Sequence, residues 1–497
     1  MTLRFGTDGV RGVAGSELTP ELVLALGRAA GRVVVGEPQV WYLGRDTRRS
    51  GPMLGAALAA GLTAEGADVV DLGVVPTPAV AAIAASRQAP AAMVSASHNP
   101  YADNGIKLFG PGGRKLDDET EARVEAELAR LVEGAGPSVG EGGPGPSGRS
   151  ARAGSGDGPV APEGWPGRVR EGGPHVPEDG PRAREGTGVG VLRADPQVWS
   201  WYRNRIIDVG LGGRRLDGIR VAVDCANGAA SHLAPAVLTG AGADVVAVLG
   251  DEPDGSNINA GCGSTDPSRL AAAVVAEGAD VGLAFDGDAD RLIAVDGTGR
   301  VVDGDRLLAI FAADLRHRGR LRGDTVVVTV MSNLGFHRAM AAEGIAVHQT
   351  GVGDRLVLAA LEEGNWSLGG EQSGHIIFAD LATTGDGILA GVALLDALCR
   401  ERRTLEDWAG GIMDRVPQVL RNVTVSDRAG LDDATAVWDA VAAVEHDLAG
   451  TGRVLLRPSG TEPLVRVMVE APTEDLAAAA VDRLEQALVA ALGAGAR

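Results

Sequence analysis

Three carboxylates stand at alternate positions in the stretch DGDADR at residues 286–291, directly after the apolar run VGLAF. A buried strand would deliver them to one loop, where Asp286, Asp288 and Asp290 can converge on a hard cation. An EF-hand is excluded, because its sixth position needs Gly and holds Arg291, and its twelfth needs Glu and holds Gly297. An acidic surface loop is the alternative. The pattern predicts a metal site and favours Mg²⁺, since few protein ligands leave room for phosphate.

A second polar stretch, SASHNP at residues 95–100, follows the apolar run AAMV. A tight loop after a strand can hold a serine clear of the sheet, so Ser97 is predicted to be a nucleophile. The same residue types build ordinary strand-to-loop connections, and this stretch alone does not separate the two interpretations. Asp103-Asn104-Gly105 is predicted to form a further turn that returns Lys107 to an apolar run.

A turn near the C-terminus carries an arginine on each side. Guanidinium, hydroxyl and backbone N–H groups together can cradle phosphate. The residues that offer them are Arg457, Ser459, Gly460, Thr461 and Arg466. The turn lacks the GxxxxGK[ST] pattern of a Walker A loop, and a plain Gly/Pro turn is the alternative.

A polar loop at residues 369–375 reads GGEQSGH. Glu371 and Ser373 suit sugar hydroxyls, because carboxylates and hydroxyls bond in fixed directions, and His375 could move a proton. Alone, such a loop is a weak signal. Two Arg-bearing turns, GTDGVRG with Arg11 and Gly44-Arg45-Asp46, are individually interpreted as surface turns.

Strand and helix patterns alternate along the chain, which predicts α/β layers with largely parallel pairing. Residues 18–35 have helical spacing behind Thr19-Pro20, a good N-cap and first-turn pair, and residues 91–94 and 280–285 are apolar strands. Gly and Pro make up almost half of residues 134–188, so this tract is predicted to be a disordered insertion or linker.

The composition excludes several classes of protein. With 497 residues, 45% of them hydrophobic, the chain suits three or four domains. The net charge of −20 argues against nucleic acid as a partner, although an anionic small substrate responds to the local field of a cleft. Three distant cysteines indicate neither disulfides nor zinc, and no signal peptide or membrane span is apparent. A cytoplasmic protein is expected.

In this order, SASHNP with NGIK, DGDADR, GEQSGH and RPSGTEP resemble the motifs of the α-D-phosphohexomutase superfamily. Within it, FGTDGVRG, NINAGCGST at 257–265, VGDR at 352–355, GGEQSGHIIF and TTGDG at 383–387 are similar to bacterial phosphoglucosamine mutases. The resemblance covers nearly the whole chain outside residues 134–188. Leu356, after VGDR, stands where an aromatic residue is expected, which concerns local packing only.

The resemblance implies three similar αβ domains and a smaller C-terminal α+β domain around a central cleft. Each domain would give one loop to the cleft. The expected domains are 1–190 with the phosphoserine loop, 191–301 with the metal loop, 302–415 with the sugar-binding loop and 416–497 with the phosphate-binding loop.

The resemblance also implies roles for the residues already singled out. Ser97 would carry the phosphoryl group and join Asp286, Asp288 and Asp290 as an Mg²⁺ ligand. Arg11, Lys107 and His375 would assist proton and phosphoryl transfer. The expected substrate-binding residues are Arg291, Glu371, Ser373, Arg457, Ser459, Gly460, Thr461 and Arg466.

The activity implied is the interconversion of glucosamine 6-phosphate and glucosamine 1-phosphate through a sugar 1,6-bisphosphate, in the supply of amino-sugar nucleotides and cell-wall precursors. A phosphoglucomutase or phosphomannomutase of the same superfamily is the nearest alternative, and a non-catalytic sugar-phosphate-binding homologue is a more distant one. The expected partner is a small sugar phosphate, with neither nucleic acid nor membrane. A homodimer is left open.

Overall fold

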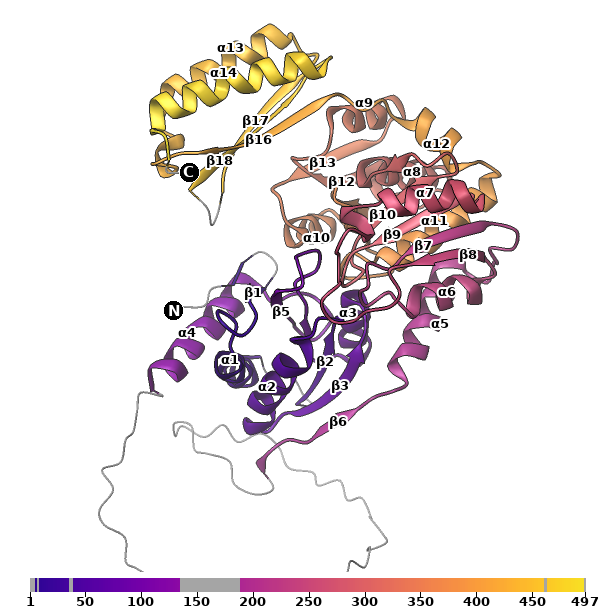
Figure 1. Cartoon of the computed structure of the whole chain (residues 1–497), viewed down its shortest axis with the longest axis vertical. Helices are drawn as coiled ribbons and strands as arrows, with labels where there is room; N and C mark the ends of the chain where they lie inside the picture. Colours follow the sequence, from indigo (N-terminus) through magenta and orange to yellow (C-terminus); the bar gives the residue numbers. More distant parts are fainter. Residues whose placement is uncertain (1–4, 7–8, 35–38, 135–187, 460–462, 496–497) are drawn as a thin grey trace, which may run out of the picture.

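The computed structural model describes residues 5–6, 9–34, 39–134, 188–459 and 463–495. Four sheets, each covered by helices, follow one another in an arc, so that the last returns toward the side of the first (Figure 1). We call these units domains 1 to 4. None of the helices within the described ranges is long and apolar enough to cross a membrane.

Domain 1 contains a mixed sheet of order β1-β5-β4-β2-β3-β6. Its strands are β1 (Val10–Val13), β2 (Val40–Arg45), β3 (Asp68–Val74), β4 (Ala91–Val94), β5 (Asp103–Phe109) and β6 (Leu192–Ala194). Its helices are α1 (Pro20–Val33), α2 (Gly51–Ala64), α3 (Thr77–Arg87) and α4 (Asp118–Gly134). The side chain of Thr19 caps α1 by accepting the N–H of Leu22 at 3.3 Å, as the sequence predicts.

Domain 2 contains a sheet of order β11-β10-β9-β7-β8. Its strands are β7 (Arg220–Asp224), β8 (Asp244–Leu249), β9 (Val281–Phe285), β10 (Leu292–Asp296) and β11 (Val301–Val302). Its helices are α5 (Val198–Leu211), α6 (Leu233–Ala241), the short η2 (Gly263–Thr265) and α7 (Ser268–Glu277). The division predicted at residue 190 stays a prediction, and β6 just beyond it pairs with β3 of domain 1.

Domain 3 contains a sheet of order β13-β12-β14-β15. Its strands are β12 (Thr325–Thr329), β13 (Ala346–Thr350), β14 (Leu368–Gly370) and β15 (Ile376–Phe378). Its helices are α8 (Gly304–His317), the short η3 (Arg322–Asp324), α9 (Leu334–Ala342), α10 (Asp354–Glu363), α11 (Gly387–Glu401) and α12 (Leu405–Ile412).

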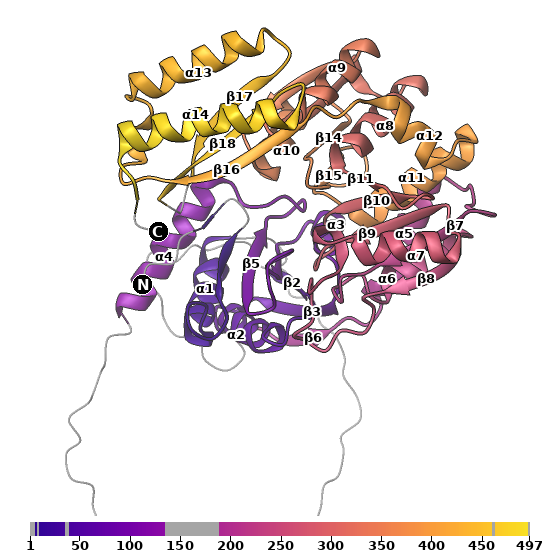
Figure 2. The same ribbon diagram turned by 45° about the horizontal axis from the view of Figure 1, so that its top comes forward.

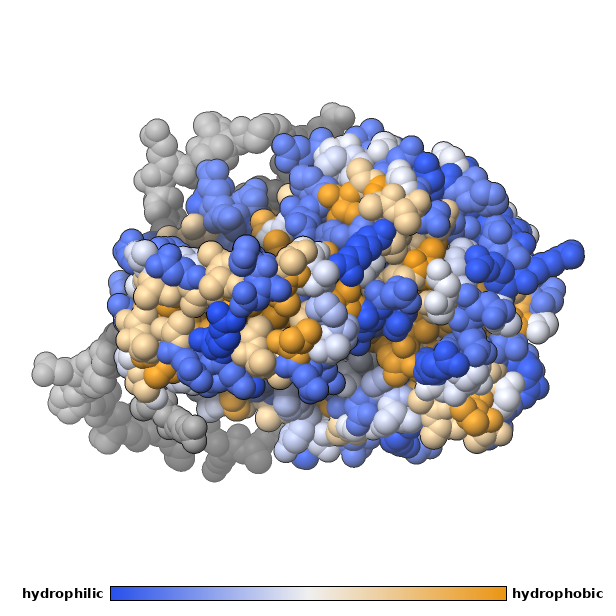
Figure 3. All heavy atoms as spheres, turned by 90° about the horizontal axis from the view of Figure 1, so that it is seen from above, coloured by the Kyte–Doolittle hydropathy of each residue, from blue (hydrophilic) through white to orange (hydrophobic). Residues whose placement is uncertain are grey.

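Domain 4 contains an antiparallel sheet of order β16-β18-β17 with two long helices on one face (Figures 1 and 2). Its elements are β16 (Gln418–Thr424), η4 (Ala429–Leu431), α13 (Thr435–Leu448), β17 (Arg453–Pro458), β18 (Leu464–Glu470) and α14 (Glu474–Leu492). Seen from above, the outer surface of the molecule mixes apolar and hydrophilic residues (Figure 3). In domain 4, Trp438 and Leu476 are exposed.

Domains 1, 2 and 3 repeat one arrangement of four strands. In each, the first strand lies between the second and the third and is parallel to both, and the third turns back through a hairpin into an antiparallel fourth. The hairpins are β4–β5, β9–β10 and β14–β15. The predicted α/β class is therefore confirmed, and each sheet combines a parallel core with an antiparallel edge.

The predicted turn at Asp103–Gly105 is wrong, because these residues begin strand β5. Gly105 lies between two other strands, and a Cβ there would be 2.6 Å from the carbonyl oxygen of Ser95 and 2.9 Å from that of Val10. Glycine is needed for this close backbone approach rather than for a turn.

One hydrophobic cluster runs through the first three domains and includes Val80, Phe285 and Leu394. Domain 4 has a separate cluster around residues such as Val467 and Leu484. Domains 1 to 3 therefore share apolar packing, whereas domain 4 has a core of its own.

Candidate active site

The four motifs found in the sequence all occupy antiparallel hairpin loops. SASHNP lies between β4 and β5, DGDADR between β9 and β10, GEQSGH between β14 and β15, and the RPSGTEP stretch links β17 to β18. The first three are thus equivalent positions in one repeated unit. A hairpin at the end of a buried strand is a rigid base from which a polar loop can project.

Ser97 lies in the left-handed backbone region, with φ at 54°, and is 1% exposed. Its Oγ donates a hydrogen bond to Oδ2 of Asp286 at 2.5 Å. These residues are 189 positions apart in the chain, so the contact joins the hairpin loop of domain 1 to that of domain 2. The predicted nucleophile and the predicted metal loop therefore meet directly.

The backbone of Ser97 is held from both domains by residues that the sequence did not single out for this role. Its carbonyl oxygen accepts from Nη2 of Arg48 at 2.8 Å and from Nδ2 of Asn259 at 2.9 Å. Both donors also bond to the carbonyl oxygen of Asn99. This clamp offsets the strain of a non-glycine residue at positive φ, which costs about 1–3 kcal/mol.

A buried relay supports the same loop. The N–H of Ser97 donates to Oγ of Ser95 at 2.9 Å, and that hydroxyl donates to Oδ2 of Asp46 at 2.7 Å. Asp46 and Arg48 form an ion pair with both side chains fully buried. The sequence interpretation of Gly44–Asp46 as a surface turn is therefore wrong, because Gly44 and Arg45 belong to β2 and Asp46 is buried. Burial raises the pKa of Asp46, although Arg48 opposes the shift. The run RDTR directly after a strand is the signal that could have shown this.

Asp286, Asp288 and Asp290 are buried, and each offers one oxygen that lies within 4.8 Å of the others. Burial raises the pKa of Asp286 well above its usual range, and the neighbouring Asp290 and Asp288 carboxylates add to the shift. Oδ1 of Asp288 is buried and accepts no hydrogen bond from the described residues. A small hard cation is bound by oxygen ligands, and three carboxylate oxygens converge here. A buried carboxylate oxygen without a hydrogen bond is also stabilised by a cation, so the residues fit a metal ion.

Lys107 is fully buried and lies against this triad. Its Nζ donates to Oδ2 of Asp288 at 2.8 Å and to Oδ2 of Asp290 at 3.3 Å. The side chain comes from β5, which follows the loop of Ser97. Lys107 thus places a positive charge of domain 1 among the carboxylates of domain 2.

Arg11, Arg291 and His98 also lie around the loop of Ser97. Nη1 of Arg11 donates to Oδ1 of Asn99 at 3.3 Å, and Nδ1 of His98 lies 3.5 Å from Oγ of Ser97. Burial, together with the charges of Arg291 and Arg11, lowers the pKa of His98 to about 4. His98 is therefore neutral at pH 7. Arg291 donates its backbone N–H to Oδ1 of Asp286 at 3.2 Å, which helps to hold the metal loop.

Polar side chains of the β14–β15 loop in domain 3 form hydrogen bonds within the domain. Oε2 of Glu371 accepts from Oγ of Ser373 at 3.2 Å, and Oε1 accepts from the N–H of Gly353 at 3.3 Å. Gly353 belongs to the VGDR stretch singled out in the sequence.

His375 is buried, and its Nε2 accepts the backbone N–H of Gly385 at 3.1 Å. In the neutral ring this bond places the proton on Nδ1. Gly385 belongs to TTGDG, so this stretch orients the histidine of the β14–β15 loop.

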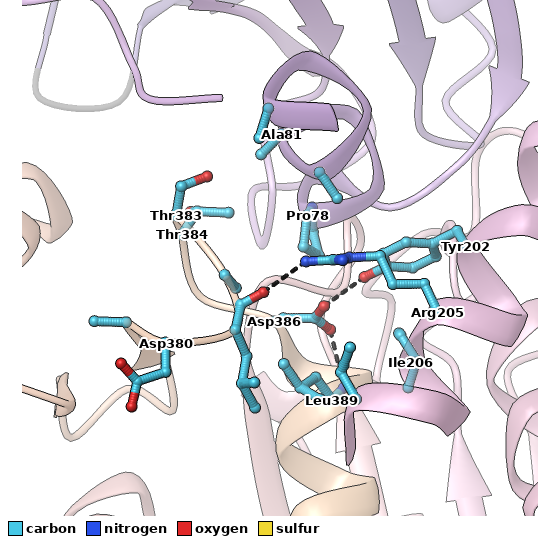
Figure 4. A pocket seen from close by; sticks show the side chains of 16 residues that line it. Pro78, Ala81, Tyr202, Arg205, Ile206, Asp380, Thr383, Thr384, Asp386 and Leu389 are labelled. Carbon is cyan, nitrogen blue, oxygen red and sulfur yellow. Dashed lines mark hydrogen bonds between the residues drawn. The ribbon is translucent and has the colours of Figure 1, made fainter. Parts of the chain in front are cut away.

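Helix α5 of domain 2 holds the chain at Leu381, before TTGDG, and at Asp386 within it (Figure 4). Tyr202 donates its hydroxyl to Oδ2 of Asp386 at 2.6 Å, and Arg205 donates to the carbonyl oxygen of Leu381 at 2.8 Å. Asp386 in turn caps α11 by accepting the N–H of Leu389 at 2.9 Å. Burial raises the pKa of Asp386 to about 6. The segment is therefore fixed where domains 2 and 3 meet.

In domain 4, Arg457 and Arg466 face each other across the β17–β18 hairpin. Burial and the charge of Arg466 lower the pKa of Arg457, while the charge of Glu371 opposes this shift, so the β14–β15 loop of domain 3 is near. Two opposed guanidinium groups favour an anion between them. Ser459 is buried and its carbonyl oxygen accepts from Arg428 at 2.6 Å. Gly460 and Thr461 lie outside the described residues.

Four domain families of phosphoglucomutase/phosphomannomutase match the chain. They are α/β/α domain I over residues 2–134, domain II over residues 202–299, domain III over residues 303–416 and the C-terminal domain over residues 420–487.

Two solved structures share the fold over nearly the whole chain. A phosphoglucomutase/phosphomannomutase family protein from Burkholderia thailandensis has a TM-score of 0.71 at 25% identity, covering 98% of this chain and 97% of its own. N-acetylphosphoglucosamine mutase of Aspergillus fumigatus, solved in complex with GlcNAc-6P and magnesium, has a TM-score of 0.65 at 18% identity, covering 99% and 96%.

Sequence relatives are more similar. A phosphoglucosamine mutase from Desulforudis audaxviator (strain MP104C) is 49% identical over 97% of this chain and 96% of its own. Another from Mycolicibacterium paratuberculosis (strain ATCC BAA-968 / K-10) is 47% identical over 98% and 99%. The chain therefore belongs to the phosphoglucomutase/phosphomannomutase family, among its phosphoglucosamine mutases, which confirms the resemblance of the motifs.

Proposed function

We propose that this protein interconverts glucosamine 6-phosphate and glucosamine 1-phosphate, with Ser97 carrying the phosphoryl group and Mg²⁺ bound by Asp286, Asp288 and Asp290. The contact that carries the proposal is the 2.5 Å hydrogen bond from Ser97 to Asp286. This contact places the hydroxyl of Ser97, whose backbone has a positive φ, beside a carboxylate triad that fits a cation. The relatives named phosphoglucosamine mutase support the amino sugar as substrate.

Phosphoryl transfer needs positioning and neutralisation of charge. Bound Mg²⁺ would supply neutralisation of the phosphoryl oxygens and of the three carboxylates. Lys107 adds a fixed positive charge, because its ammonium group already bonds to two of those carboxylates. The charges of Arg11 and Arg291, strong enough to lower the pKa of His98, favour an anion at the same place.

In the first half of the reaction, the 1-hydroxyl of glucosamine 6-phosphate attacks the phosphorus of phospho-Ser97. A new O–P bond forms, the Ser97 Oγ–P bond breaks, and in net terms the proton of the sugar hydroxyl passes to Oγ of Ser97. The product is the 1,6-bisphosphate. Meanwhile Arg457, Ser459 and Arg466 hold the 6-phosphate, and Glu371 and Ser373 orient the sugar through its hydroxyls.

In the second half, the bisphosphate turns end for end, so that its 6-phosphate lies at Ser97 and its 1-phosphate lies at Arg457 and Arg466. The serine hydroxyl then takes the phosphoryl group from O6 and glucosamine 1-phosphate is released. The anion site at Ser97 and the one at Arg457 and Arg466 would each accept either phosphate, so the bisphosphate can bind in both orientations. With its ring proton on Nδ1, His375 is proposed to act as a hydrogen-bond donor to the sugar phosphate, and Lys107 and Arg11 to stabilise the transferring group.

An assay of sugar choice tests the proposal. The purified protein would be assayed with Mg²⁺ and a trace of glucose 1,6-bisphosphate. Its kcat/KM would be compared for glucosamine 6-phosphate, glucose 6-phosphate and mannose 6-phosphate. We expect the highest kcat/KM on the amino sugar. Equal or faster turnover of glucose 6-phosphate would instead assign the neutral-sugar activity of the same family. The cytoplasm and a homodimer remain predictions from the sequence.

A further inference from the structure

Asp288 of the metal loop is held mainly by domain 1 rather than by its own domain. Three groups of domain 1 reach it. Thr77 donates its hydroxyl to Oδ2 at 2.5 Å and its backbone N–H to the Asp288 carbonyl oxygen at 3.0 Å, and Lys107 donates to Oδ2 at 2.8 Å. The metal loop is thus joined to domain 1, which contains Ser97, through Asp288, the middle one of its three aspartates.

Thr77 is the first residue of α3 and is completely buried. Its neighbour Pro76 is the N-cap residue and provides no side-chain hydrogen bond to the helix. The Asp288 carbonyl therefore serves as the acceptor at this helix end, and the positive end of the α3 dipole faces the carboxylate.

The two oxygens of the Asp288 carboxylate differ in their hydrogen bonds. Oδ2 accepts from both Thr77 and Lys107, whereas Oδ1 is buried and accepts from none of the residues that the structure describes. A carboxylate whose one oxygen is occupied by two donors offers its other oxygen to a cation. Groups that orient a ligand in this way affect metal affinity by roughly 10- to 100-fold.

We infer that Thr77 is a positioning residue for the metal site, whose hydroxyl turns the Asp288 carboxylate so that Oδ1 faces the cation. The inference rests on the metal site of the proposed function. Its consequence is that cation affinity in domain 2 depends on a side chain in domain 1.

Thr77→Val tests this, because it removes the hydroxyl at nearly constant volume. The readout is the dissociation constant for Mn²⁺ on the full-length, dephosphorylated protein, measured by electron paramagnetic resonance of the free ion. We expect roughly 10- to 100-fold weaker binding. Thr77→Ser keeps the hydroxyl and should restore the wild-type constant, which a role in packing alone would not predict.

Thr47→Val is the matched control. Oγ1 of Thr47 donates across the same pair of domains to the carbonyl oxygen of Asn227 at 2.6 Å, and not to a carboxylate of the metal loop. Unchanged Mn²⁺ binding in this control supports the inference. Equal weakening in both variants would mean that docking of the domains alone matters, and would overturn it.

Two further results separate this inference from the proposed function. If wild type binds Mn²⁺ and Thr77→Val binds it equally well, the role of Thr77 fails while the metal site stands. If wild type binds no Mn²⁺, the metal site and the inference fail together. Should Thr77→Val not fold, as judged by its melting temperature, Thr77→Ala replaces it, since a smaller side chain at the buried site adds no misplaced methyl group.

Discussion

Ser97 combines a strained backbone with a hydroxyl bonded to a carboxylate. A φ of 54° is unfavourable for serine, and the residue keeps it because Arg48 and Asn259 bind its carbonyl oxygen. The same geometry directs the hydroxyl at Asp286. At the scale of single residues, the geometry of Ser97 therefore depends on two side chains that lie outside the motif loops.

Ser97→Ala should abolish the mutase reaction, because no other group at this position can accept the phosphoryl group. We expect kcat to fall by more than roughly 10³-fold and incorporation of labelled phosphate from a sugar bisphosphate to stop. The exposed Ser256→Ala serves as the control and should retain full activity. Full labelling of the Ser97 variant would show that another residue is phosphorylated.

At the scale of elements, hairpin loops bring the catalytic groups together by close backbone approach. A Cβ at Gly287 would lie 2.6 Å from the Ser97 carbonyl oxygen and 2.8 Å from Cδ1 of Ile258. No L side chain fits this gap without moving one of the two loops. The metal loop can therefore approach the nucleophile only through a glycine between Asp286 and Asp288.

Gly287→Ala should displace the metal loop from Ser97, and we expect kcat to fall by at least roughly tenfold, as when a catalytic group is misplaced. Gly410→Ala is the control, since a Cβ there meets nothing within 4 Å and the residue lies within α12. This control should be active and no less stable than wild type. Retained activity in Gly287→Ala would contradict the close approach of the loops.

Burial of Asp305 in α8 predicts a pH dependence of stability. Desolvation raises its pKa to about 7, although the N–H of Asn333 bonds to it. The unfolded value is about 3.9, so between these pH values the folded state binds more protons than the unfolded state. Stability is therefore lost as pH rises through this window, by about 4 kcal/mol in total.

Asp305→Asn removes this ionisation. Its melting temperature should exceed that of wild type at pH 8, and the difference should shrink at pH 5. The exposed Asp432→Asn should show no such pattern. A constant difference at both pH values would mean that Asp305 does not titrate in this range.

At the scale of the whole molecule, a shared apolar core joins domains 1 to 3, and polar contacts hold domain 4. Glu470 of β18 is fully buried and accepts hydrogen bonds from Asn333 and from the N–H of Leu334, both in domain 3. Arg453 of β17 pairs with the same carboxylate at 2.6 Å. The β17–β18 hairpin is thus anchored to domain 3 at the end of the strands that contains Arg453 and Glu470.

Residues 135–187 connect α4 to the residues before β6 and lie outside the described residues. Loop length adds little to the free energy of closure, so the active site should not depend on this tract. Replacing residues 140–180 with a flexible Gly/Ser linker of 15 residues should leave kcat/KM within about twofold of wild type and change the unfolding free energy by about 1 kcal/mol or less. A large loss of activity in the steady-state assay would instead assign the tract a role in catalysis.

The sequence by itself determined the chemical groups and the local elements that carry them. The strand at residues 91–94 and the capped first helix are where the pattern predicts, and the four motifs identified the family, because these features depend on neighbours in the chain. Only the tertiary structure decided which loops meet. Ser97 bonds to Asp286 and Thr77 bonds to Asp288 across domains, Asp46 is buried, and Asp103 begins a strand. Spacing along the chain does not encode such contacts, since they arise from the packing of separate domains on one another.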